Sequence, residues 1–123
     1  MVEDKFANAL VAGALLKSYR EKRNLSQSDV AQQLGYRNVN FISMIESGKS
    51  NIPIARIIDV LNAYQIEAEM ALALVKKLQP EIWQLFKHMI TTNPELLKKK
   101  FGEIEDDLDK KFGRVLKEYG LGV

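Results

Sequence analysis

The 123-residue sequence contains no cysteine, one histidine (His88) and only three prolines. The absence of cysteine excludes disulfide bonds, thiol catalysis and cysteine-ligated zinc, and one histidine cannot form a multi-histidine metal centre. Long apolar runs are also lacking, because the longest, near residues 9–16, is interrupted by Gly13 and is too short to span a bilayer. Acidic Glu3 and Asp4 precede this run, which makes it a poor signal peptide. We therefore expect a cytoplasmic protein without a metal, a cofactor or a membrane segment.

Neither sign of charge is in clear excess, since 18 lysines and arginines stand against 16 aspartates and glutamates, for a net charge of +2. Such a balance is by itself weak support for a polyanionic partner. Apolar residues make up 46% and charged residues 28% of the chain, which are ordinary values for a folded protein. No nucleophile–base pair or metal-ligand set is evident, so we do not expect an enzyme.

Helical periodicity dominates the chain, whereas β-branched residues never alternate over a long stretch. Ser26 is a good N-cap residue, and Asp29 three positions later can complete a capping box. Gly35 and Gly48 suit the left-handed conformation that often ends a helix. The sequence therefore predicts an all-α fold. The expected helices cover about 5–22, 27–34, 38–47, 53–64, 67–78, 80–91 and 94–119.

Two short helices joined by a glycine-containing turn, over about 27–34 and 38–47, are typical of a helix-turn-helix. The first is only about two turns long, so it must pack against its neighbours to be stable. The next helix is expected to begin near Pro53, a residue that favours the first turn. Its expected buried stripe consists of Ile54, Ile57, Ile58 and Leu61.

The expected helix 38–47 has two unlike faces when its residues are placed 100° apart. Ile42 and Ile45, flanked by Phe41, form the face expected to be buried. The opposite face lacks the lysine or glutamate of a typical solvated helix and could contact DNA base edges through hydrogen bonds and apolar groups. A plain surface helix is the alternative interpretation. The residues of this predicted base-reading face are Asn40, Ser43, Met44 and Ser47.

A series of motifs runs through residues 16–66: Arg20, Leu25-Ser26-Gln27, Val30-Ala31, Leu34-Gly35, Ile42-Ser43 and Ile45-Glu46-Ser47-Gly48-Lys49. In this order they resemble the Cro/phage-repressor-like (XRE) helix-turn-helix family, over about 50 of the 123 residues. The resemblance implies a five-helix, repressor-like domain whose third helix enters the DNA major groove. We therefore expect a DNA-binding domain over 1–66, followed by a helical C-terminal region over 67–123.

The resemblance also implies roles for single residues. Gln27 matches a position that binds a phosphate at the start of the second helix. Arg20 and Glu46 match a structural pair that bridges the first and third helices. We further expect Lys49, in the loop after the third helix, and Arg37, the cation nearest the reading face, to bind phosphates.

Two departures from the family pattern affect the expected geometry. Seven residues separate Gly35 from Ser43, where the family usually has six, so we expect a turn that is one residue longer. Gln65 occupies the place of the usual glycine after the fourth helix. Because glutamine is costly in a left-handed turn, we expect that helix to run on or to bend differently.

The second half of the chain offers no catalytic constellation. The acidic run 103–109 lacks the glycine and ligand spacing of a calcium loop and is expected to be a solvated helix face. One apolar stripe follows the last helix at spacings of three and four: Leu97, Phe101, Ile104, Leu108, Phe112, Val115 and Tyr119. Because such a stripe must be buried, we expect the C-terminal helices to pack on one another and on a second copy.

The expected function is that of a sequence-specific transcriptional regulator, such as a repressor, which binds double-stranded DNA as a homodimer. A two-fold DNA site with half-sites about 34 Å apart requires two recognition helices. The alternative is a protein-binding module, such as an antitoxin whose C-terminal helices bind a partner protein.

Overall fold

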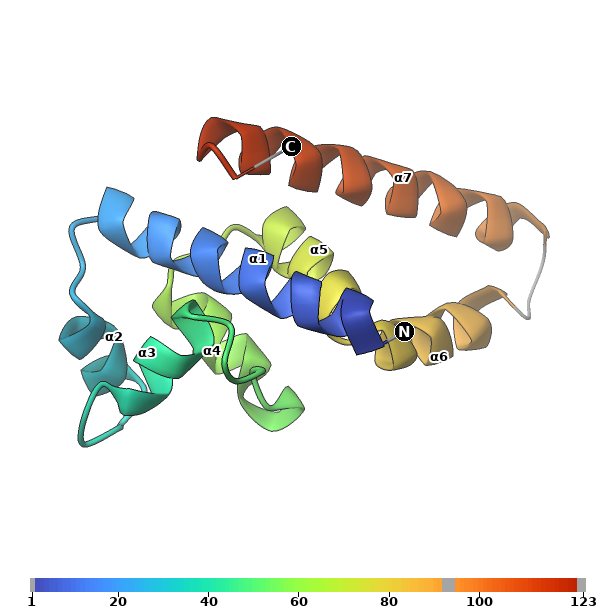
Figure 1. Ribbon diagram of the computed structural model, residues 1–123. Coiled ribbons are helices and arrows are strands. Elements are labelled where there is room, and N and C mark those ends of the chain that lie inside the picture. Colours follow the sequence, from blue (N-terminus) through green and yellow to red (C-terminus); the bar gives the residue numbers. More distant parts are fainter. Residues whose placement is uncertain (1, 92–94, 122–123) are drawn as a thin grey trace.

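The computed structural model describes residues 2–91 and 95–121, and within these ranges it contains helices and no strands (Figure 1). The all-α prediction is confirmed. The elements are α1 (Val2–Lys22), α2 (Gln27–Gln33), α3 (Asn40–Glu46), the 3-10 helix η1 (Ile54–Arg56), α4 (Ile57–Ala63), α5 (Ala68–Leu78), α6 (Pro80–Thr91) and α7 (Glu95–Glu118). Leu97 belongs to the expected C-terminal stripe, but its side chain is not among those that the structure describes.

Helix α1 runs through the middle of the molecule, with α2, α3 and α4 on one side and α7 on the other (Figure 1). It packs against both α3 and α5, and α5 in turn packs against α6 and α7. One continuous apolar cluster therefore extends from α1 to α7, with Leu15, Tyr64 and Leu74 fully buried. Helix α5 joins the first four helices to the C-terminal pair.

The apolar stripe of α7 is buried within the same chain, against α5 and α6. Its exception is Ile104, of which 48% is exposed. At the end of the stripe, the ring centroid of Tyr119 lies 5.2 Å from that of Tyr19 in α1. The stripe does not, by itself, require a second copy of the chain. Its buried members are Phe101, Leu108, Phe112 and Val115.

The acidic residues of the run 103–109 are mostly exposed, as expected, but two of them also hold α7 to its neighbours. Glu105 accepts a hydrogen bond from the indole of Trp83 at 2.9 Å and pairs with Lys87 at 2.7 Å. Asp109 accepts from Lys76 of α5 at 2.6 Å. Burial raises the pKa of Glu105, but its bonds to Lys87 and Trp83 outweigh this effect, and the pKa lies below its ordinary value.

The buried stripe of the fourth helix differs from the expected one. Ile57 and Leu61 are buried, but Ile54 and Ile58 are 51% and 61% exposed. Residues 54–56 form a 3-10 turn, and the α-helix begins at Ile57. The inward face then continues through Val60 and Leu61 to Tyr64, at helical spacing.

Gln65 adopts the left-handed conformation itself, with a φ of 59°. Its N–H donates to the carbonyl of Asn62 at 2.9 Å, and the N–H of Ile66 donates to that of Leu61 at 3.1 Å. These two bonds form a Schellman motif, the same ending that Gly35 and Gly48 give to α2 and α3. Helix α4 therefore ends at Ala63, and the expectation that it runs on or bends differently is wrong.

Helices α1 and α3 cross so closely that Gly13 has no room for a side chain. A Cβ at Gly13 would lie 2.6 Å from the carbonyl oxygen of Glu46 and closer still to that of Ile45. Both atoms belong to the backbone, so they cannot move aside without a shift of α3. The glycine that interrupts the apolar run near 9–16 thus sets the distance between the two helices.

We predict that Gly13→Ala lowers the free energy of unfolding by about 1 to 3 kcal/mol, the usual cost of forcing extra atoms into a packed interface. The matched control is Gly113→Ala in α7, where a Cβ meets no atom within 4 Å. There, the better helix propensity of alanine should raise stability by up to ~1 kcal/mol. Urea denaturation measures the free energy of unfolding of both variants. An equal increase in stability for the two would contradict the close crossing of α1 and α3.

Candidate nucleic-acid interface

Helix α3 is shorter than expected, because it covers residues 40–46 instead of 38–47. The side chain of Asn38 accepts a hydrogen bond from the N–H of Asn40 at 3.0 Å, just before the helix begins. Ile42 and Ile45 point inward and are buried. The helix is only seven residues long, so its position depends on the contacts that hold this inner side.

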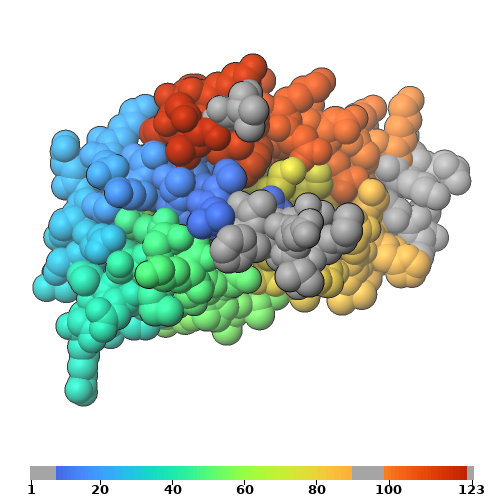
Figure 2. All heavy atoms as spheres, viewed as in Figure 1, coloured from blue at the N-terminus to red at the C-terminus, as the bar shows by residue number. Residues whose placement is uncertain are grey.

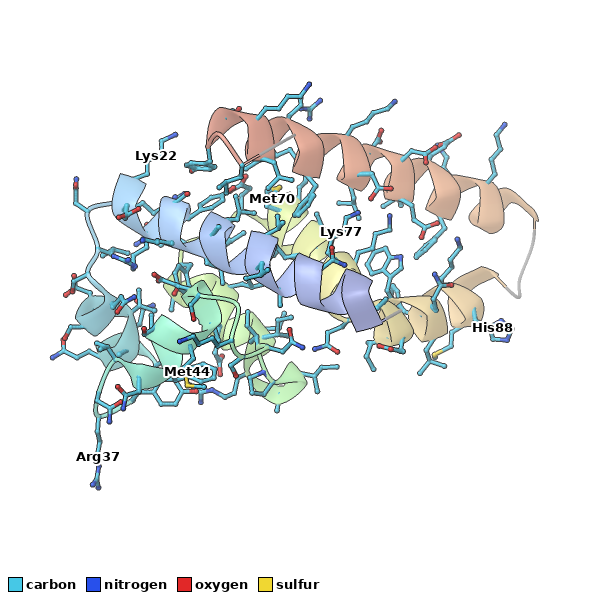
Figure 3. All side chains as sticks on the ribbon, in the orientation of Figure 1. Lys22, Arg37, Met44, Met70, Lys77 and His88 are labelled. Atoms are coloured by element: carbon cyan, nitrogen blue, oxygen red, sulfur yellow. The ribbon has the colours of Figure 1, made fainter. Side chains whose placement is uncertain are left out.

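The outer face of α3 is exposed to solvent, as its spacing predicted. Met44 is 44% exposed, and Figure 3 shows it on the side of α3 away from α1. The hydroxyl of Ser47 donates to the carbonyl of Met44 at 3.1 Å. The base-reading role of the four residues stays a prediction. All four are exposed: Asn40, Ser43, Met44 and Ser47.

On the inner side of α3, the structure brings Arg20 and Glu46 together in a bidentate ion pair. The Nε and Nη2 atoms of Arg20 donate to the two carboxylate oxygens of Glu46 at 2.8 and 3.0 Å. The hydroxyl of Tyr64 donates to the same carboxylate at 2.6 Å, and the amide of Gln27 donates at 3.2 Å. One carboxylate therefore links α3 to α1, to α2 and to the end of α4.

This carboxylate is buried and ionised. Burial raises the pKa of Glu46, but its three hydrogen-bond donors outweigh this effect, so the pKa lies below its ordinary value. The bond to Glu46 raises the pKa of Arg20, against the opposite effect of burial. The contribution of Glu46 to stability is therefore fully present above about pH 4.3, the ordinary value for glutamate, and is lost as the pH falls through the lower folded value.

Gln27, expected to bind a phosphate, has its side-chain amide on Glu46. It also lines a shallow hollow of about 170 Å³ beside the outer face of α3, together with Ser43 and Ser47. Lys17 of α1 contributes a cation to the same hollow. The sequence around Lys17 does not mark it as a phosphate ligand, because an exposed lysine in a long helix has no local feature that distinguishes such a contact from a solvated side chain.

The other two expected phosphate ligands lie at the two ends of α3. Arg37 is exposed and extends from the turn before α3, away from the body of the molecule (Figure 3). Figure 2 shows a projection in the colour of this turn. Lys49 is exposed in the loop that follows α3. The structure thus places one cation before and one after the reading face. Their contact with phosphates stays a prediction.

Two aromatic rings and one guanidinium pack at the turn between α2 and α3. The rings of Tyr36 and Phe41 have their centroids 5.0 Å apart. Arg56 donates to the carbonyl of Leu34 at 2.9 Å, and its guanidinium lies 5.2 Å from the ring centroid of Tyr36. The partner carbonyl is 22 residues away, so no local pattern could reveal this support for the longer turn.

A family model described as a helix-turn-helix domain matches residues 13–77, more than half of the chain. The chain belongs to this helix-turn-helix family. The domain is of the XRE/Cro-type class, in agreement with the resemblance seen in the sequence. The matched range extends past residue 66 and includes most of α5. No curated protein and no solved structure matches the chain.

Two further findings concern the described part of the chain. None of its helices combines the length and the hydropathy of a bilayer-spanning segment. In the same residues, no group of three or more acidic or histidine side chains is arranged to hold a metal ion. The family match and the exposure of its outer residues make the face of α3 the candidate functional site.

We predict that Arg20→Met lowers the free energy of unfolding by about 3 to 5 kcal/mol, because it leaves the charge of Glu46 buried without its main partner. The control is Lys76→Met, which removes the cation of the partly exposed pair with Asp109 and should cost less than about 1 kcal/mol. Urea denaturation of the two variants at neutral pH compares them. Equal losses would mean that the pair on α3 is no more important than a surface pair.

Proposed function

We propose that the protein is a sequence-specific transcriptional regulator that places α3 in the major groove of double-stranded DNA. The helix-turn-helix domain indicates a DNA-binding regulator. The observation that supports sequence-specific binding through α3 is the outer face of this helix, which is exposed and uncharged. A helix of this character is not repelled by phosphates and can approach base edges.

Asn40 stands at the start of α3, where recognition helices usually make base contacts. Its amide can pair with the N6 and N7 atoms of adenine. Ser43 lies about one turn further and can bond to several bases, while the exposed thioether of Met44 suits the thymine methyl. Ser47 lies at the end of α3 and is the weakest of the four candidates, because its hydroxyl already donates to its own helix.

Phosphate contacts are proposed at both sides of this face. Arg37 precedes α3 and Lys49 follows it, so the two cations can reach the two backbones that border a groove. Gln27 and Lys17 meet at the hollow beside Ser43, where a phosphate oxygen could accept from the lysine. Such contacts supply affinity and make it dependent on salt concentration.

Selection from a random pool of double-stranded DNA tests the proposal. We expect a two-fold site, and we expect Asn40→Ala to lose discrimination at one base position of each half-site, by about 1 to 3 kcal/mol. The control is Asn62→Ala, which removes an exposed amide on α4 and should leave the preference unchanged. The proposal fails if the wild-type protein enriches no sequence, or if the two variants change the preference equally.

We also propose that the protein acts as a homodimer, with α6 as the contact. Because the apolar stripe of α7 is buried within the chain, we do not propose it as the surface for a second copy. Helix α6 exposes an apolar stripe of its own, at spacings of three, one and three. Its members are Ile82, Leu85, Phe86 and Met89, exposed by 43%, 58%, 52% and 64%.

The spacing of this stripe suits a two-fold contact. When two α6 helices lie antiparallel, Ile82 faces Met89 of the partner subunit, and Leu85 faces Phe86 of the partner subunit, so one stripe complements itself. Helix α6 also lies at the other end of the molecule from α2 and α3 (Figure 1). Pairing there leaves the face of α3 open to DNA in both copies.

Leu85→Glu should shift the mass measured by sedimentation equilibrium from twice 14.0 kDa to 14.0 kDa, because it places a charge at the centre of the contact. It should also weaken binding to the two-fold DNA site at least about tenfold, the effect of losing one tethered half-site contact. The control is Leu72→Glu, at an exposed leucine of α5. A wild-type protein that stays at 14.0 kDa would contradict the dimer and favour a different protein as the occupant of α6.

A further inference from the structure

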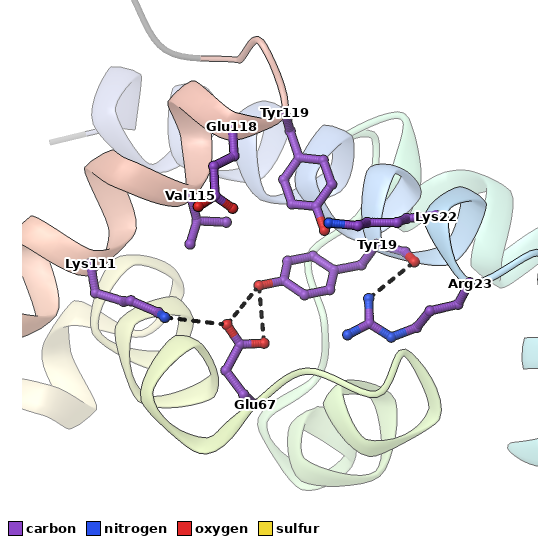
Figure 4. Close-up of a pocket in the computed structure, with 8 residues that line it drawn as sticks. All are labelled: Tyr19, Lys22, Arg23, Glu67, Lys111, Val115, Glu118 and Tyr119. Atoms are coloured by element: carbon purple, nitrogen blue, oxygen red, sulfur yellow. Dashed lines mark hydrogen bonds and ion pairs between the residues drawn. The ribbon is translucent and has the colours of Figure 1, made fainter.

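A second hollow, of about 390 Å³, lies far from the face of α3, where the last turn of α1, the start of α5 and the last turns of α7 meet (Figure 4). This volume is in the range of small-molecule sites. Its walls come from segments that are distant in the sequence, between Tyr19 and Tyr119. The hollow has no part in the proposed contacts with DNA.

The floor of this pocket is a carboxylate that already has its partners. The buried hydroxyl of Tyr19 donates to both oxygens of Glu67, at 3.0 and 3.1 Å. The ammonium of Lys111 lies 3.8 Å from the same carboxylate. Burial and the bond to Glu67 raise the pKa of Tyr19, so this hydroxyl stays protonated. The negative charge of Glu67 is therefore already balanced by Lys111 and stabilised by the hydroxyl of Tyr19 before any ligand binds.

The rim of the pocket holds two cations that rest on aromatic rings. The ammonium of Lys22 lies 5.5 Å from the ring centroid of Tyr119, and the guanidinium of Arg23 lies 4.8 Å from that of Tyr19. Among the described residues, neither cation has a carboxylate at ion-pair distance. With Lys111, the pocket has three cations against the two carboxylates of Glu67 and Glu118.

We propose that this pocket binds a small anion that carries a planar ring. Its carboxylate or phosphate pairs with Lys22 and Arg23. Lys22 can exchange its weak cation–π contact for a charge-assisted hydrogen bond, and Arg23, which donates to the carbonyl of Tyr19 at 3.3 Å, has further N–H groups for the anion. Its ring lies against the apolar wall formed by Val115 and Tyr119. The ligand would join the last turn of α1 to α7. The proposal does not depend on DNA binding, and its test contains no DNA.

The test is a titration of the ¹⁵N-labelled full-length protein, followed by amide chemical shifts. Benzoate and adenosine monophosphate are the two ring-bearing anions, and they distinguish a carboxylate ligand from a phosphate ligand. Benzyl alcohol and adenosine are their neutral analogues, and inorganic phosphate is the anion without a ring. We expect saturable shifts at residues 19–23, 67 and 111–119 with at least one ring-bearing anion, and binding at least tenfold weaker with all three controls.

Lys22→Gln and Arg23→Gln should each weaken binding of the ring-bearing anion at least fivefold. Lys99→Gln, which removes an exposed cation near the start of α7 and outside the pocket, should leave that binding unchanged. The proposal is overturned if neither benzoate nor adenosine monophosphate gives saturable shifts at the pocket. It is also overturned if inorganic phosphate or the neutral analogues bind as tightly, or if Lys99→Gln weakens binding as much as Lys22→Gln does.

Discussion

The buried carboxylate of Glu46 is the interaction on which the rest of the structure depends. Helices α2 and α3 each contain only seven residues and have little stability of their own. Hydrogen bonds from Arg20, Gln27 and Tyr64 join α3 to three other elements through this one group. The carboxylate therefore fixes both the depth and the rotation of α3, and with them the direction in which its outer face points.

The remainder of the molecule supports this arrangement from both sides. Gly13 lets the backbones of α1 and α3 approach closely, and Arg56 holds the end of α2 beneath the longer turn. On the other side, α5 packs against α1 as well as against α6 and α7. The side-chain hydrogen bonds and the ion pair that join Glu46 of α3 to other helices lie on the inner side of α3. Its outer side is thus left neutral and exposed, which is the property that a base-reading surface needs.

Features set by local chemistry could be predicted from the sequence. Ser26 and Gly35 delimit α2, and a 100° spacing placed Met44 on the exposed side of α3. The pairing of Arg20 with Glu46 followed from the family resemblance, because no local pattern joins residues 26 positions apart.

Features that depend on distant neighbours could not be predicted. The hydroxyl of Tyr64 reaches Glu46 across 18 residues, and Glu105 is held by an indole from another helix. Gln65 adopts an unfavourable left-handed conformation, and two backbone hydrogen bonds together with the burial of Ile66 offset its free-energy cost. Ile58 is exposed because the inward face of α4 runs through Ile57, Leu61 and Tyr64, a choice made by packing against the rest of the core.

The most direct measurement is an amide chemical-shift map of the full-length protein, recorded with and without a selected DNA duplex. The account predicts the largest changes at residues 40–47, with further changes near Gln27, Arg37 and Lys49, while α6 keeps the spectrum of the DNA-free protein. Changes confined to α6 or α7, with residues 40–47 unmoved, would contradict the claim that Glu46 holds α3 in place for reading DNA.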